Sequence, residues 1–167
     1  SAGMGILAVG YALLSDGTPA RRLLVGALGF IWAIRLAWHL ISDRVIGQPE
    51  DGRYRAMREH WGRRAPLFFF VFYQGQAVVA TLFSIPILAA MRSGSLDAWV
   101  AAGVAVWLVA VLGEAAADRQ LARFRADPAH QGKTCRQGLW RYSRHPNYFF
   151  EWVHWFSYVL IGHAVWL

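Results

Sequence analysis

The sequence predicts an all-α fold, a polytopic transmembrane helical bundle. Of its 167 residues, 56% are hydrophobic and only 16% are charged, against about 25% charged in soluble domains. The apolar residues also form runs of about 20, the length a helix needs to cross a bilayer. A single cysteine excludes a disulfide scaffold, and the apolar content excludes a disordered chain. We expect residues 1–167 to form one transmembrane domain, truncated at both ends because each end lies within an apolar run.

We expect about five membrane-associated helices, separated by turn-forming or basic links. Their ranges are 1–14, 20–41, 66–90, 98–127 and 146–167. The first range is shorter than a full membrane span, and the turn-forming residues 15–19 follow it. Pro66 and Pro146 each stand at a favoured helix-start position. We expect residues 53–61 to form an amphipathic helix at the membrane interface.

The basic residues predict an orientation for these helices. Most of the 17 Lys and Arg residues lie in 42–65 and 115–145, whereas the opposite links hold Arg21, Arg22 and Arg92. The positive-inside rule therefore places the two long basic segments in the cytoplasm. This bias also accounts for the net charge of +7, so we expect a lipid bilayer, and no nucleic acid, as a partner.

Arg35 lies within an apolar segment, about 10 Å from its cytoplasmic end at about 1.5 Å per residue. Charges at this depth are costly and are usually paired or functional. One interpretation is that Arg35 snorkels to the headgroups. The other interpretation is a water-filled cavity that is open to the cytoplasm and lined by Trp32, Arg35 and His39.

Glu114 and Asp118 are four residues apart and share one helix face, and Arg125 extends the same stripe. Carboxylates facing lipid would be expensive, so we expect the stripe to face the protein interior. An ordinary solvated helix end is the alternative.

A second polar group surrounds the predicted start of the last helix. Asn147 and Glu151 are again four residues apart, and they follow Arg141, Arg144 and His145. Cations beside the free N–H groups of a helix N-terminus make a favourable phosphate site. The alternative is a basic cluster that meets anionic lipid. We expect no metal, because Glu151-x-x-His154 is one copy of a motif that di-iron bundles use twice.

The segment 138–151 reads Gly-Leu-Trp-Arg-Tyr-Ser-Arg-His-Pro-Asn-Tyr-Phe-Phe-Glu. Its Arg-His-Pro-x-Tyr core resembles membrane sterol reductases and isoprenylcysteine-type methyltransferases. With Asn before the Tyr and an acid three residues after it, the segment is most similar to the steroid 5-alpha-reductase family, especially its bacterial members. Residues 54–62 and 117–125 also fit that family.

The resemblance implies a seven-helix fold in a bacterial inner membrane, with an NADPH site facing the cytoplasm. The implied reaction transfers hydride to the β-carbon of an enone in a steroid-like lipid, as in 3-oxo-4-ene steroid reduction. The implied alternative is an S-adenosylmethionine-dependent methyltransferase of the isoprenylcysteine type. The sequence has no Gly-x-Gly-x-x-Gly motif, so any dinucleotide would bind without a Rossmann domain.

The resemblance also assigns candidate residues. The family's catalytic acid would precede Ser1, and Trp32 and Arg35 are candidates for the substrate pocket. Phe150 departs from the pattern because the family usually has Gly there. The cofactor-binding candidates are Arg35, Arg44, Glu114, Asp118, Arg125, Arg141, Tyr142, Arg144, His145, Asn147, Tyr148 and Glu151.

Overall fold

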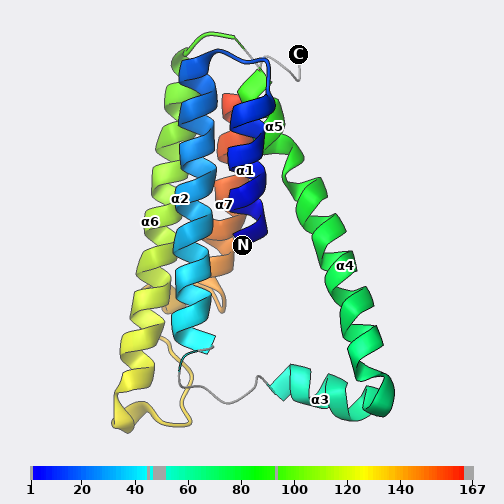
Figure 1. The fold of residues 1–167 in the computed structure, drawn as a ribbon. Helices are drawn as coiled ribbons and strands as arrows, with labels where there is room; N and C mark the ends of the chain where they lie inside the picture. The colour runs from blue at the N-terminus through cyan, green and yellow to red at the C-terminus, as the bar shows by residue number, and fades with distance from the viewer. Residues whose placement is uncertain (1, 45, 47–51, 93, 164–167) are drawn as a thin grey trace. The chain divides into compact units, whose positions relative to one another are not determined.

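The computed structural model describes residues 2–44, 46, 52–92 and 94–163, with the side chains of Asp43 and Arg44 outside the description. Within these ranges every regular element is a helix (Figure 1). Three helical stretches are long and apolar enough to cross a membrane, namely Pro19–Ser42, Gly52–Arg92 and Ala98–Ala126. The predicted all-α transmembrane class is therefore confirmed, and the chain is an integral membrane protein.

The chain divides into two compact units, Ser1–Met91 and Arg92–Leu167. The first unit opens with α1 (Ala2–Leu14) and α2 (Pro19–Arg44), which pack as a hairpin. Arg22 closes this hairpin, because its Nε donates to Ala12 O at 2.6 Å and its Nη2 to Leu13 O at 2.7 Å. Carbonyls at a helix C-terminus have no partner within the helix, and Arg22 satisfies two of them.

The predicted helix over 66–90 is interrupted, and this expectation is wrong in detail. The structure has α4 (Ala65–Phe83) and α5 (Ile85–Arg92), with a turn at Ser84 between them. Pro86 has no N–H to donate to the carbonyl of Leu82, which weakens the helix at this point. Ser84 is buried, and its Oγ donates to Thr81 O at 2.6 Å and lies 2.7 Å from Tyr11 Oη.

The predicted helix over 53–61 is present as α3 (Gly52–Trp61), followed by the 3₁₀ turn η1 (Gly62–Arg64). Gly62 has φ +50°, a left-handed conformation that glycine adopts at little cost. The chain passes through this turn directly into α4 (Figure 1).

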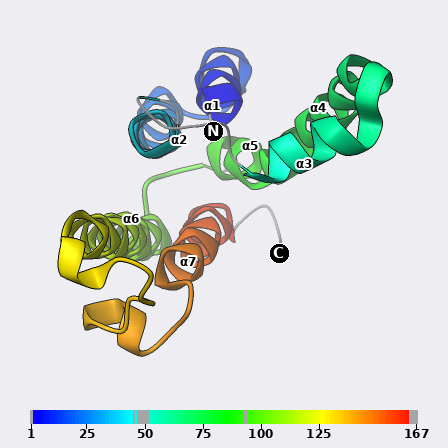
Figure 2. The same cartoon turned by 90° about the horizontal axis from the view of Figure 1, so that it is seen from below.

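The second unit is built on the pair α6 (Ala98–Ala126) and α7 (Pro146–Ile161). Asp97 caps α6, because its carboxylate accepts a hydrogen bond from Val100 N at 3.0 Å. Two short 3₁₀ elements, η2 (Pro128–His130) and η3 (Gly138–Arg141), lie in the connection. Figure 2 shows α6 and α7 side by side with this connection at one end. Residues 164–167 of the predicted last helix lie outside the described part.

Candidate functional site

The α6–α7 pair brings a carboxylate and an amide together from positions far apart in the sequence. Asn147, on the first turn of α7, donates from Nδ2 to Oδ1 of Asp118 on α6 at 3.2 Å. Glu114 and Asp118 are only 3% and 7% exposed. The prediction that these two carboxylates face the protein interior is therefore confirmed.

A glycine sets how closely α6 and α7 approach beside this pair. A Cβ atom added to Gly113 would overlap the ring of Phe150, so the ring occupies the space that the glycine leaves. Gly113 and Phe150 immediately precede Glu114 and Glu151 in the sequence. The departure of Phe150 from the family pattern thus has a structural consequence, since its ring packs on the helix that carries the buried acids.

The loop before α7 is attached to α6 by two residues, Gln120 and Trp140, to which the sequence analysis assigned no role. Gln120 Oε1 accepts from the backbone N–H of Leu139, and Trp140 Nε1 donates to Ala117 O, both at 2.9 Å. Gly138 has φ +55°, and a Cβ there would lie 2.5 Å from Gln120 Oε1. The glycine opening the motif segment is the sequence signal for this close approach.

Cationic residues and the start of α7 lie at the same end of this unit. Pro146 is at the start of α7 as predicted, and the side chain of the N-cap residue, His145, makes no capping hydrogen bond. Arg141, Arg144 and His145 are exposed, and the His145 ring stacks on Tyr148 with centroids 5.3 Å apart. Tyr142 is 84% exposed. An uncapped helix N-terminus beside exposed guanidinium groups favours an anion.

Arg125 does not share the interior with Glu114 and Asp118, and that expectation is wrong. It lies seven residues beyond Asp118, about 10 Å along the helix at about 1.5 Å per residue, and its side chain is exposed. The contact of Asp118 with Asn147 marks the start of α7. Arg125 therefore stands on the part of α6 that continues past α7.

Glu151 lies on α7 and is half-buried. The other predicted residues belong to the first unit. Trp32 is 2% exposed, and Arg35 and His39 are half-buried on the same helix. The side chain of Arg44 lies outside the described part.

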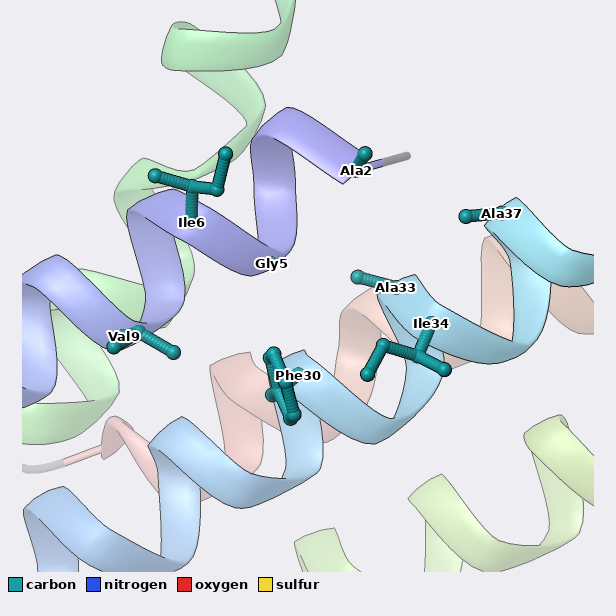
Figure 3. Close-up of a pocket in the computed structure, with 8 residues that line it drawn as sticks. All are labelled: Ala2, Gly5, Ile6, Val9, Phe30, Ala33, Ile34 and Ala37. Atoms are coloured by element: carbon teal, nitrogen blue, oxygen red, sulfur yellow. The ribbon is translucent and has the colours of Figure 1, made fainter.

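An apolar pocket of about 410 Å³ lies between α1 and α2 (Figure 3). Trp32 and Arg35 are not among the residues that line it. The sequence pointed to the polar side of α2 and did not identify this pocket. The lining residues are Ala2, Gly5, Ile6, Val9, Phe30, Ala33, Ile34 and Ala37.

His154 is held in a hydrogen-bonded group inside the second unit. Its Nε2 lies 3.1 Å from the Tyr158 hydroxyl, and Ser157 Oγ donates to His154 O at 2.6 Å. All three side chains are fully buried. This packing gives the histidine of the Glu-x-x-His pattern a structural role in the helix pair.

Fold and site together define an integral membrane protein in which buried carboxylates lie beside a cationic helix N-terminus. The sequence matches the family described as "Protein of unknown function (DUF1295)" over residues 1–167. The chain belongs to this family. Searches of curated proteins and of solved structures found no match.

Proposed function

We propose that this chain is part of a membrane-embedded, NADPH-dependent reductase that transfers hydride to the β-carbon of an enone in a steroid-like lipid. The observation that carries the proposal is the hydrogen bond between buried Asp118 and half-buried Asn147 at the arginine-flanked start of α7. A phosphorylated dinucleotide needs cations for its phosphates and acceptors for its hydroxyl and amide groups. Both kinds of group occur here on adjoining segments.

The residues present suit such a cofactor. Arg141 and Arg144 are exposed and free to make charge-assisted hydrogen bonds to phosphate oxygens. Asn147 Oδ1 is a buried acceptor with no hydrogen-bond partner among the described residues. An unsatisfied buried acceptor is costly, so a ligand amide or hydroxyl that donates to Asn147 would stabilise the site. Glu114 and Asp118 are further acceptors at this depth.

NADPH would supply the hydride, and the chain would bind, orient and shield the reactants. The buried α6–α7 interface offers a setting in which polar groups act at low dielectric. Taken by itself, the first unit contains an apolar pocket between α1 and α2 whose volume of about 410 Å³ falls in the range of about 300–1,000 Å³ typical of ligand pockets, so it is large enough for a hydrophobic ligand.

The family assignment agrees with the resemblance at the level of the superfamily. DUF1295 lies within the steroid 5-alpha-reductase-like superfamily, in agreement with the resemblance of residues 138–151 to the reductase family. The methyltransferase alternative shares the Arg-His-Pro-x-Tyr core. Asn147 favours the reductase, because the methyltransferase core does not require an amide at that position.

Binding is the direct test, because the proposed function requires this chain to hold NADPH. The purified protein in lipid nanodiscs is heated with and without NADPH, and the unfolding midpoint is recorded. A ligand present at about 100 times its Kd stabilises the native state by about 2.7 kcal/mol, so the midpoint should rise clearly. Asn147→Ala should abolish most of this rise, and Arg144→Gln should reduce it.

Gln131→Ala is the matched control, because it removes an exposed amide from the loop before α7 and should respond to NADPH like the parent. S-adenosylmethionine is tested in parallel. Stabilisation by S-adenosylmethionine alone would favour the methyltransferase. An unchanged NADPH response in both Asn147→Ala and Arg144→Gln would show that the site has been placed wrongly.

A further inference from the structure

Helix α3 is held at the foot of α4 by a cluster of aromatic rings. Trp61 stacks on Phe68 with centroids 5.3 Å apart and meets Phe69 edge-on at 5.1 Å. Tyr54 lies 6.2 Å from Phe69, and the Arg58 guanidinium lies 5.5 Å from the centre of the same ring. The apolar stripe of α3 is therefore directed at α4, which leaves the rest of its surface for other contacts.

That remaining surface is strongly basic. Gly52–Arg64 contains five arginines and a single carboxylate, Glu59, and every one of these charged side chains is exposed. Arg63 and Arg64 continue the positive charge of α3 through η1. A cluster of five exposed arginines attracts an anionic partner over about one Debye length, roughly 10 Å at moderate salt.

The direction of α3 identifies the partner. Figure 1 shows α3 running across the axis of α4, and the stretch Gly52–Arg92 meets the length and hydropathy of a membrane span. If α4 crosses the bilayer, α3 lies along its surface at the level of the headgroups. Trp61 and Tyr54 then occupy the interface, where such rings are enriched.

We propose that α3 and η1 form a binding surface for anionic phospholipid headgroups on the cytoplasmic leaflet. The exposed arginines contact the lipid phosphates, and the aromatic cluster holds α3 at the level of the headgroups. This surface contains none of the residues assigned above to the cofactor, so its test does not depend on the proposed reductase activity.

The full chain is reconstituted in phosphatidylcholine nanodiscs that contain trace spin-labelled phosphatidylglycerol or spin-labelled phosphatidylcholine. The fraction of motionally restricted label gives the relative affinity for each headgroup. We expect the parent to prefer phosphatidylglycerol. The triple variant Arg55→Gln, Arg63→Gln, Arg64→Gln should lose most of this preference, because each arginine at an anionic surface contributes roughly a fivefold effect.

Two matched variants make the result specific. Replacing the same three arginines by Lys retains the charge, and the preference should persist. Arg119→Gln, Arg123→Gln, Arg136→Gln removes three exposed cations from the other basic segment, and most of the preference should remain. The proposal fails if this second triple variant loses as much preference as the first, if the Lys variant loses it, or if the parent shows none.

Discussion

The Asp118–Asn147 hydrogen bond offsets the cost of holding a carboxylate inside a membrane protein. Asp118 is 7% exposed and accepts from Asn147 Nδ2 at 3.2 Å. Charged groups at such depth are stable only when they are paired or hydrated. The amide supplies one of the required donors, and it positions its own Oδ1 as an acceptor in the same buried space.

This hydrogen bond should be measurable as a coupling between α6 and α7. We expect Asp118→Ala and Asn147→Ala each to lower the free energy of unfolding, and the double variant to lower it by less than the sum. The coupling should be about 1 kcal/mol, within the usual range for hydrogen bonds in proteins and between membrane helices. Reversible unfolding in mixed micelles measures all four forms. If the effects of the two single variants add up to that of the double variant within about 0.3 kcal/mol, the hydrogen bond between Asp118 and Asn147 is contradicted.

The packing of α6 on α7 depends on small residues that let the backbones approach. A Cβ on Gly103 would lie 2.5 Å from Ile161 Cγ1 and 2.8 Å from Ser157 O, and one on Gly113 would overlap Phe150. Small residues are typical of membrane helix interfaces, because lipid tails provide no hydrophobic drive for association. The position of the buried acids on α6 is thus fixed by this close contact.

We predict that Gly113→Ala destabilises the protein by about 1–3 kcal/mol, the usual cost of overpacking. The double variant Gly113→Ala, Phe150→Leu should regain part of the loss, since the ring that meets the added methyl group is gone. Gly10→Ala in α1 is the control. A Cβ there meets nothing within 4 Å, and alanine favours a helix over glycine by about 1 kcal/mol, so this variant should be at least as stable as the parent. Thermal unfolding in detergent compares the variants. Equal stability of Gly113→Ala and the parent would refute the packing.

At the scale of the whole molecule, we expect charge rather than packing to set the orientation in the membrane. The positive-inside rule predicts that both long basic segments, 42–65 and 115–145, lie in the cytoplasm. The turn between α1 and α2 then lies on the opposite side. The proposed cofactor site and the proposed lipid-binding surface both require this orientation.

Thiol labelling tests the orientation directly. The single cysteine, Cys135, is buried and is replaced by Ser, and one new cysteine is introduced at an exposed position, Asp16→Cys or Ala129→Cys. A membrane-impermeant maleimide should label Asp16→Cys in spheroplasts and Ala129→Cys only after the membrane is opened. The reverse labelling pattern would place the start of α7 on the side of the membrane away from the cytoplasm, and would contradict the proposed cofactor site.

The sequence was sufficient for the helical class and for most helix positions. Runs of apolar residues and the helix-start prolines Pro66 and Pro146 report local properties, so they can be read without a fold. The apolar run continues through Ser84, so hydropathy alone does not predict the break there; Pro86 is the local signal for it. The sequence predicts the wrong environment for Arg125, because helical spacing gives the face of a residue but not how far the neighbouring helix extends.

By itself the sequence therefore determined that this protein crosses the membrane, and that its unusual polar residues fall in three groups, around Arg35, Glu114 and Asn147. Only the tertiary structure decided which of them meet. Asp118 and Asn147 are 29 residues apart, and their contact depends on the antiparallel register that Gly113, Phe150, Gln120 and Trp140 impose. The physical reason is that periodicity is a local property of the chain, whereas contact between helices depends on close packing over long sequence separations.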